Sequence, residues 1–304
     1  MGKIAFVFAG QGAQHAGMGK DLYETNAAAR AVFDEAERLR PGTLTECFGS
    51  DEAVLQETKN TQPDMFVVEA ATAAALAASG IQADVAAGFS LGELAALSYA
   101  GAADFKAMFQ LVCARGALMQ AAAEAQPTAM AAVLKLSAEE VEKIALGFDN
   151  VYPVNFNCPG QVSCSGLADE MKDFMKAVKA AGGRAVPLKV KGGFHSPFMK
   201  EAAQAFDEKL AAMAFQPLTC PVYANHSGDV YAADVVTDLS KQMAHPVRWE
   251  TSVRHMISGG VDTFIEIGPG DTLCGMIKRI DGNVRRYTTN TVEEIGKIIT
   301  EVKA

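Results

Sequence analysis

Apolar residues are distributed along this chain in two patterns that alternate with one another. Short, nearly continuous apolar runs predict buried strands, at residues 4–8, 84–87, 222–225 and 263–267. Between them, apolar residues recur at helical spacing, which predicts helices at residues 21–38, 64–79, 93–99, 104–120 and 197–213. Strands that alternate with helices are typical of the α/β class, so we expect a mostly parallel sheet covered on both faces.

The middle of the chain follows a different pattern. Residues 128–136 alternate like a strand, and Ser137-Ala138-Glu139-Glu140 is a capping signal that starts a helix. The elements that follow are a hairpin around Pro159-Gly160 (151–157 and 162–165), a helix (167–181) and a strand (184–190). This βαββαβ order is ferredoxin-like. We therefore expect a small subdomain, residues 126–191, inserted into a large hydrolase-like domain formed by residues 1–125 and 192–304.

Composition narrows the class of protein. The chain has 304 residues, 49% of them hydrophobic and 21% charged, as in a globular protein with a large core. Its net charge of −9 argues against nucleic acid as a partner. The apolar stretch 65–80 contains Glu69 and is too short for a membrane span, and no secretory signal is visible. We therefore expect no association with a membrane. The 6 cysteines have no C-x-x-C spacing, so we expect no metal site and a reducing, cytoplasmic location.

Ser90 lies in a G-x-S-x-G pentapeptide between a predicted strand and a predicted helix. This context is typical of a nucleophile elbow, in which a sharp turn exposes the serine hydroxyl. The N–H of Leu91 would then point at a negative charge that develops beside the serine. Ser90 and Glu93 also fit S-x-x-E, an ordinary helix capping box, and the pentapeptide alone does not decide between the two.

A serine nucleophile needs a base, and His195 is the best placed of the 5 histidines. It lies in the loop Gly192-Gly193-Phe194-His195-Ser196-Pro197, where the inserted segment returns to the large domain. A structural role for a loop histidine is the alternative. No acidic residue stands in an obvious third position, so a dyad oriented by a backbone carbonyl is as plausible as a triad.

Arg115 continues the apolar stripe of the helix at 104–120, because it lies between Val112 and Met119 at helical spacing. A buried guanidinium must be paired. Its partner is either an internal Asp or Glu or a substrate carboxylate held by two hydrogen bonds. We expect Met119, on the same stripe, to contact the substrate as well.

Seven motifs, in this order, resemble those of the acyltransferase family of fatty acid and polyketide synthesis, the malonyl-CoA:acyl carrier protein transacylases. They cover nearly the whole chain and are Phe8-Ala9-Gly10-Gln11-Gly12-Ala13-Gln14, Gly88-Phe89-Ser90-Leu91-Gly92-Glu93, Arg115, Asn155-Phe156-Asn157-Cys158-Pro159-Gly160-Gln161, Gly193-Phe194-His195-Ser196-Pro197, His245-Pro246-Val247-Arg248-Trp249 and Glu266-Ile267-Gly268-Pro269-Gly270. The chain departs from many family members at Phe89, where they have histidine, and at His245, where they have asparagine.

The resemblance implies a role for each matching residue. Ser90 would be the acylated nucleophile, His195 its base, and Arg115 the ligand of the malonyl carboxylate. The N–H groups of Gln11 and Leu91 would form the oxyanion hole, and the main-chain carbonyl of Gln242 would orient the histidine. Asn157 would line the site. Phe194 would select malonyl over α-methylated groups.

The resemblance also implies the reaction and the partners. A malonyl group would move from coenzyme A, a substrate rather than a cofactor, through a malonyl-serine to the phosphopantetheine thiol of acyl carrier protein. We expect no cofactor and a monomer. Arg184, Lys189, Lys191 and Lys200 cluster in the sequence, which predicts either a docking patch for the acidic carrier or an ordinary solvated charged face. The alternatives are a trans-acting polyketide synthase acyltransferase, a serine hydrolase or thioesterase with the same elbow, and a non-catalytic scaffold that binds the carrier protein.

Overall fold

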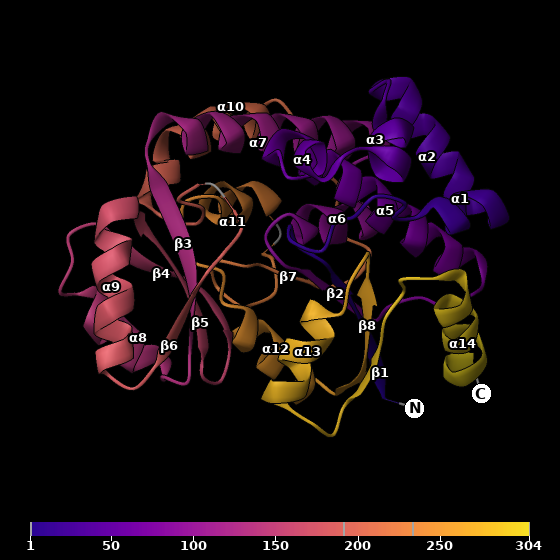
Figure 1. Cartoon of the computed structure of the whole chain (residues 1–304). Helices are drawn as coiled ribbons and strands as arrows, with labels where there is room; N and C mark the ends of the chain where they lie inside the picture. Colours follow the sequence, from indigo (N-terminus) through magenta and orange to yellow (C-terminus); the bar gives the residue numbers. More distant parts are fainter. Residues whose placement is uncertain (1, 191, 233, 304) are drawn as a thin grey trace.

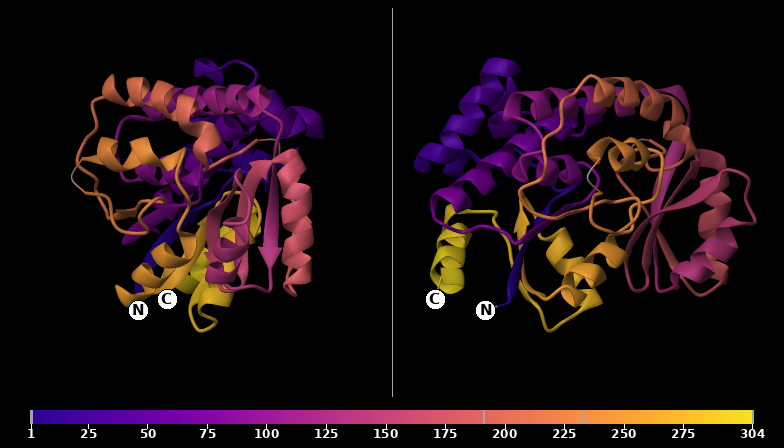
Figure 2. Two further views of the ribbon diagram at one scale, coloured as in Figure 1. Left: turned by 90° about the vertical axis from the view of Figure 1, so that its left-hand side faces the viewer. Right: turned by 180° about the vertical axis from the view of Figure 1, so that it is seen from behind.

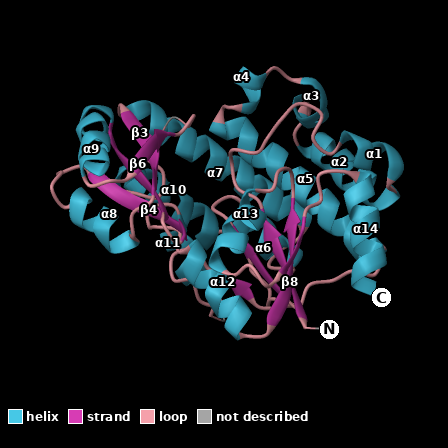
Figure 3. Cartoon of the chain, turned by 60° about the horizontal axis from the view of Figure 1, so that its bottom comes forward, coloured by secondary structure: helices cyan, strands magenta, loops and turns pink. Residues whose placement is uncertain are grey.

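The computed structural model describes residues 2–190, 192–232 and 234–303, and it contains two sheets in two separate groups (Figure 3). The larger sheet is parallel throughout, and its strand order is β7-β2-β1-β8-β9. Its strands are β1 (Lys3–Phe8), β2 (Val85–Gly88), β7 (Val222–Tyr223), β8 (Val261–Ile267) and β9 (Arg285–Tyr287). The expected parallel α/β sheet is confirmed.

Both faces of this sheet are buried, as the near-continuous apolar runs predict. Phe6 and Phe8 of β1 pack against helices from the first 125 residues, whereas Ala5 and Val7 pack against α12 (Trp249–Ser258) and α13 (Thr272–Ile280) on the opposite face. The helices around the first face are α1 (Lys20–Thr25), α2 (Ala27–Leu39), α3 (Thr43–Gly49), α4 (Glu52–Leu55), α5 (Thr58–Ala78), α6 (Gly92–Tyr99) and α7 (Phe105–Ala125).

The remaining helices of the large unit follow the small sheet in the chain. They are α10 (Lys200–Ala211), α11 (Val235–Gln242), α12 (Trp249–Ser258), α13 (Thr272–Ile280) and α14 (Val292–Lys303). The views in Figures 1 and 2 show α7 and α10 side by side along one edge of the molecule. Among the described helices, none is long and apolar enough to cross a membrane.

The small sheet is antiparallel, and its strand order is β4-β5-β3-β6. Its elements are β3 (Thr128–Leu134), α8 (Ala138–Ala145), β4 (Val151–Cys158), β5 (Gln161–Leu167), α9 (Ala168–Ala180) and β6 (Arg184–Pro187). This is the ferredoxin-like order that the sequence predicts. The predicted capping box also forms, since Ser137 accepts from the N–H of Glu140 and Glu140 accepts from the N–H of Ser137.

Backbone hydrogen bonds join the small sheet to the large unit. The N–H of Phe156 donates to the carbonyl of Val247 at 2.9 Å, and the N–H of Val247 donates to the carbonyl of Val154 at 2.8 Å. The edge strand β4 therefore pairs with the segment between α11 and α12. This pairing fixes the position of the inserted unit beside the large sheet.

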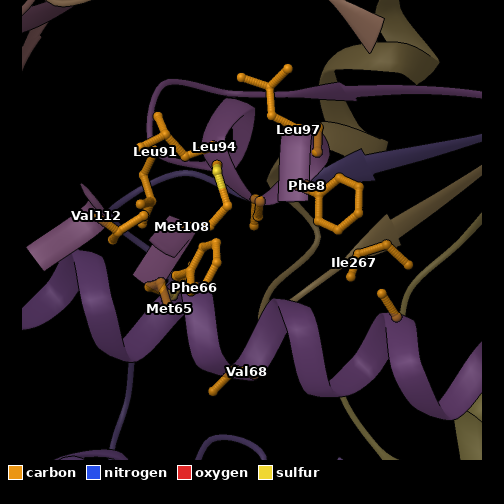
Figure 4. Close-up of a cluster of buried hydrophobic side chains, with 14 of the residues drawn as sticks. Phe8, Met65, Phe66, Val68, Leu91, Leu94, Leu97, Met108, Val112 and Ile267 are labelled. Atoms are coloured by element: carbon orange, nitrogen blue, oxygen red, sulfur yellow. The ribbon is translucent and has the colours of Figure 1, made fainter. Parts of the chain in front are cut away.

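One hydrophobic cluster surrounds the start of α6, which follows Ser90 in the chain. Figure 4 shows Leu91, which precedes α6, and Leu94 of α6 against Met65 and Phe66 of α5 and Met108 of α7. All five side chains are buried. Because interiors pack as densely as organic crystals, this cluster holds the N-terminus of α6 in a fixed position relative to α5 and α7.

Several sequence-based boundaries are wrong: α5 begins at Thr58 and not at residue 64, and α7 ends at Ala125 and not at residue 120. Three further differences concern α1 and α2, β6 and α10. The helix predicted at 21–38 is interrupted at Asn26, whose side chain accepts from the N–H groups of Ala28 and Ala29 and so starts a new helix. The strand predicted at 184–190 ends at Pro187, and the apolar residues after it line a cavity instead. The helix predicted at 197–213 opens with a 3-10 turn at Pro197–Met199 and ends at Ala211.

Candidate active site

The pentapeptide Gly88–Gly92, called the elbow below, turns sharply from β2 into α6. Ser90 has φ of 55°, which is rare for a residue that carries a side chain. A Cβ on Gly88 would lie 1.9 Å from the backbone of Gly92, and a Cβ on Gly92 would lie 2.2 Å from the carbonyl oxygen of Phe8. Only glycine therefore fits at both ends of this turn.

The capping-box alternative for Ser90 is excluded by the positions of its two side chains. The hydroxyl of Ser90 lies 2.7 Å from Nε2 of His195, and α6 has no side-chain cap. The carboxyl of Glu93 is turned to other partners, because its Oε1 accepts from the N–H of Asn225 at 3.0 Å and from the hydroxyl of Tyr231. The elbow therefore presents its serine to a histidine.

His195 is held in the orientation that a general base requires. Its Nδ1 lies 3.0 Å from the carbonyl oxygen of Gln242, which can only accept, so Nδ1 carries the proton and Nε2 offers its lone pair to Ser90. Burial, together with the smaller effect of the nearby Arg115 cation, lowers the pKa of His195 to about 4. The imidazole is thus neutral at neutral pH and free to accept a proton.

The backbones of Ser90 and His195 are both strained. Besides glycine, the described residues with positive φ are Ser90, Lys135 and His195 (φ 59°). Such conformations cost about 1–3 kcal/mol each and persist where the surroundings fix them, most often at functional sites.

Arg115 is completely buried in α7 and faces the same hydroxyl. Its Nη2 lies 3.2 Å from Oγ of Ser90 and 2.8 Å from Oε1 of Gln242, and its Nη1 lies 2.7 Å from Oε1 of Gln62. It makes no ion pair with any Asp or Glu in the part of the chain that the structure describes. Burial lowers the pKa of Arg115 to about 10, and the charge of Glu93 partly offsets this.

The internal ion pair considered for Arg115 is therefore not what the structure contains. Two glutamine amides fix the guanidinium, and amides carry no charge to neutralise it. A buried cation without a carboxylate in ion-pair contact is costly, so the site is electrostatically suited to bind an anion.

The loop after β1 lies against the elbow. A Cβ on Gly10 would lie 2.8 Å from the carbonyl oxygen of Phe89. This contact brings Gln11 and Leu91 to the wall of one cavity beside Ser90. Within the described residues, the backbone N–H groups of Gln11 and Leu91 donate to no protein acceptor, so both are available to an oxyanion.

A cavity of about 90 Å³ lies between the two units, and Ser90, His195 and Arg115 line it. Met119 and Phe194 also line it, as expected for substrate contacts, together with Met130, Leu188 and Val190 from the small unit.

Asn157 is the one predicted lining residue, among those described, that the cavity does not include. Its side chain is buried and donates to Oγ of Ser163 at 3.3 Å, whereas Asn155 lines the cavity in its place. The irregular register of β4 on either side of these residues makes the choice between them unpredictable from the sequence.

Comparison with known proteins identifies the family of this chain. Residues 5–302 match the acyl transferase domain family. The chain belongs to the acyltransferase family. A malonyl CoA-acyl carrier protein transacylase of Bacillus subtilis is 40% identical to it over 311 residues, which covers 100% of this chain and 98% of the relative. The resemblance inferred from the seven motifs is confirmed.

Solved structures of similar proteins share the fold over the whole length. The malonyl CoA-acyl carrier protein transacylase of Clostridium perfringens has a TM-score of 0.95 and 33% identity, covering 99% of this chain and 97% of its own. A malonyl-transacylase solved in complex with a type II polyketide synthase acyl-carrier protein has a TM-score of 0.95 and 32% identity, covering 98% of this chain and 99% of its own. The predicted fold class is therefore confirmed.

Sequence reasoning missed Gln62 and the side chain of Gln242. Gln62 of α5 is buried and bonds Arg115, and its Nε2 contacts the sulfur of Met119 at 3.3 Å. Only the carbonyl of Gln242 was expected to act, yet its Nε2 also donates to the carbonyl of Ser90. The one available signal for Gln62 was a polar residue in the buried stretch 61–68, because α5 is buried almost all round there.

The two departures from the family pattern lie differently in this acyltransferase. Phe89 lines the cavity and packs edge-on against Trp249, with ring centroids 5.7 Å apart. His245 is outside the cavity, and its Nδ1 bonds the carbonyl of Lys241 at 2.7 Å. Among the described residues, neither side chain forms a hydrogen bond with Ser90.

The described residues of the expected docking patch, Arg184, Lys189 and Lys200, do not line the cavity. Arg184, Lys189 and Lys200 are exposed, and Lys191 lies outside the described residues. Arg184 lines a separate surface groove that contains Lys172, Lys176 and Lys179 of α9.

Proposed function

We propose that this acyltransferase moves a malonyl group from malonyl-CoA to the phosphopantetheine thiol of acyl carrier protein, for fatty acid synthesis, through a malonyl ester on Ser90. The observation that carries the proposal is the buried Arg115, which faces the nucleophile and has amide partners in place of an internal acid. A malonyl thioester supplies both what Ser90 attacks and the carboxylate that Arg115 lacks.

In the first half-reaction, Nε2 of His195 takes the proton of the Ser90 hydroxyl as the oxygen attacks the thioester carbonyl. The negative charge that forms on the carbonyl oxygen is stabilised by the N–H groups of Gln11 and Leu91. When the C–S bond breaks, the imidazolium returns its proton to the coenzyme A sulfur. The carbonyl of Gln242 keeps the ring in one orientation throughout.

In the second half-reaction, the carrier thiol loses its proton to His195 and attacks the malonyl-serine ester. The same N–H groups stabilise the second oxyanion, and the Ser90 oxygen leaves with the proton from the imidazolium. Each step only moves a proton or an acyl group, so the proposed reaction requires neither a metal nor a redox cofactor.

We infer the substrate range from the cavity walls. Arg115 selects for a terminal carboxylate, and the ring of Phe194, which is 7% exposed, together with Met119 restricts the space beside the acyl chain. An α-methyl group on the malonyl chain would compete with the Phe194 ring for that space.

The cellular setting is also a proposal. Every group in the proposed mechanism comes from one chain, so a monomer is sufficient. The 6 cysteines are free thiols, which suits the reducing cytoplasm in which we place the reaction.

Mass spectrometry after incubation with malonyl-CoA tests the function directly. We expect one malonyl group on the peptide that contains Ser90, and its loss when a carrier protein with a free phosphopantetheine thiol is added. The Ser90→Ala variant, which lacks only the hydroxyl, serves as the control and should remain unlabelled.

Two results would contradict this proposal. A malonyl group that leaves to water at the same rate with and without the carrier would indicate a hydrolase. Unlabelled Ser90 under conditions in which the protein is folded would exclude covalent catalysis at this site. Presenting carriers from fatty acid and from polyketide synthesis in turn distinguishes the two pathways.

We also propose that Lys189 and Lys200, exposed on either side of the His195 loop, contribute to docking of the acidic carrier. Changing either to glutamate should lower kcat/KM for the carrier by up to about fivefold, since an exposed ion pair contributes about 0.2–1 kcal/mol. Transfer to a free pantetheine thiol should be unaffected. The rates are measured with each acceptor at low and high salt, because screening weakens the effect.

Lys297 supplies the matched control for docking. It lies on α14, at the opposite end of the molecule from the small unit, and Lys297→Glu makes the same change in net charge (Figure 1). If Lys189→Glu and Lys297→Glu slow transfer to the carrier equally, the overall charge of the protein is the cause and the docking proposal is wrong. If transfer to the free thiol is slowed as well, the substitution affects the catalytic step and not docking.

A further inference from the structure

The side chain of Asn225, which follows β7, bridges both ends of the strand-to-helix turn. Its Oδ1 accepts from the N–H of Ser90 at 2.7 Å, and its Nδ2 donates to the carbonyl of Gly88 at 2.6 Å. These partners are 135 and 137 residues away in the sequence. Asn225 is 2% exposed, so these bonds are shielded from water.

The backbone of Ser90 depends on partners of this kind. Its N–H precedes the first turn of α6 and has no partner within that helix. Its positive φ is a conformation that is unfavourable for a residue with a side chain. Asn225 satisfies the N–H, and Nε2 of Gln242 donates to the carbonyl of Ser90. Two side chains from distant segments thus fix both polar groups of the nucleophile's peptide backbone.

Asn225 is itself held by the helix that it helps to start. Its N–H donates to Oε1 of Glu93 at 3.0 Å, and the same oxygen accepts the hydroxyl of Tyr231. Its carbonyl accepts from the N–H of Arg248 at 2.8 Å. Because Glu93 lies only three residues after Ser90, these contacts form a closed ring between α6 and the loop after β7, and the ring leaves the carboxamide one orientation.

We propose that Asn225 is a positioning residue for acyl transfer, acting as a clamp with two ends on the backbone of the elbow. The clamp holds the Ser90 hydroxyl toward His195. By occupying the N–H of Ser90, it leaves the N–H of Leu91 as the donor that the elbow offers to the oxyanion. A carboxamide is required, since aspartate in its ionised form has no donor for the carbonyl of Gly88 and alanine has neither end.

The proposal rests on the acyl-serine mechanism above, and single-turnover acylation by malonyl-CoA tests it. We expect Asn225→Ala to lower the rate constant for malonyl-Ser90 formation about a hundredfold, as for other losses of transition-state positioning. Asn225→Asp should lower it about tenfold, because only one end of the clamp is lost. The malonyl-CoA concentration that gives half of the maximal rate should be unchanged, since Arg115 is untouched.

A merely structural role would change a different quantity. It would lower the fraction of molecules that react, the amplitude, and leave the rate constant of the folded molecules unchanged. Asn150→Ala is the matched control, because it removes an asparagine–Glu170 bond of 2.7 Å in the small unit. It should leave the rate constant at the wild-type value.

The outcomes separate this inference from the function on which it rests. If wild-type protein is not acylated, the proposed function fails. If wild-type protein is acylated and either Asn225 variant reacts with the wild-type rate constant, the clamp is overturned. Should Asn225→Ala not fold, Asn225→Asp decides, since it replaces a single NH₂ by oxygen.

Discussion

Replacing His195 by alanine is expected to slow formation of malonyl-Ser90 by roughly 10⁴- to 10⁶-fold, the range seen when a serine nucleophile loses its base. The Nε2 atom lies 2.7 Å from the Ser90 oxygen, and the structure offers no second imidazole at that position among the described residues. Without it the hydroxyl must react without a proton acceptor. The rate is measured by quenched-flow single turnover with radiolabelled malonyl-CoA.

The control for this substitution is His255→Ala. His255 of α12 bonds the carbonyl of Gly228 and pairs with Asp229, away from the cavity. Its loss should leave acylation at the wild-type rate. A His195→Ala protein that is folded and acylated within tenfold of the wild-type rate would show that another group serves as the base.

Replacing Arg115 by alanine is expected to invert the choice between malonyl-CoA and acetyl-CoA. Loss of a buried, hydrogen-bonded partner of a charged group costs about 2–5 kcal/mol, which corresponds to a fall of roughly 30- to 5,000-fold in kcat/KM for malonyl-CoA. Acetyl-CoA has no carboxylate to lose, so its use should change much less. The ratio of the two kcat/KM values is the measurement.

The acetyl rate in the same protein is the internal control. Arg115 also contacts Ser90 and Gln242, so any general damage to the nucleophile slows both substrates equally. Arg115→Lys adds a second comparison, because lysine keeps the charge but loses the planar fork that can bind two carboxylate oxygens. Equal losses with malonyl and acetyl would refute carboxylate recognition by Arg115.

The local sequence alone determined the elements that surround the nucleophile. The pentapeptide predicted the sharp turn between Gly88 and Gly92, because the need for glycine there is steric and arises mostly from neighbouring residues. The buried strand at 4–8 was predictable because its residues are apolar on both faces. The stripe on α7 placed Arg115 in the interior, because a helix repeats every 3.6 residues whatever packs against it.

Other local signals were hidden by competing chemistry. Residues 184–190 have enough apolar positions to predict a strand, yet Leu188 and Val190 are apolar because they line the cavity. Asn26 divides a stretch that has helical spacing on both sides, and its cap is invisible to a pattern of apolar positions. The helices α11 to α14 were not predicted.

The tertiary structure decided which distant groups meet. The sequence predicted a serine, a histidine and a buried arginine. Ser90 and His195 are 105 positions apart in the sequence, so their distance is undetermined until β2 and the His195 loop are packed together. The same holds for the partners of Arg115, since only packing shows that they are the amides of Gln62 and Gln242. Asn225 carries no local motif at all. Short-range sterics and periodicity are written in neighbouring residues, whereas contacts across 100 residues depend on the energy of the whole fold.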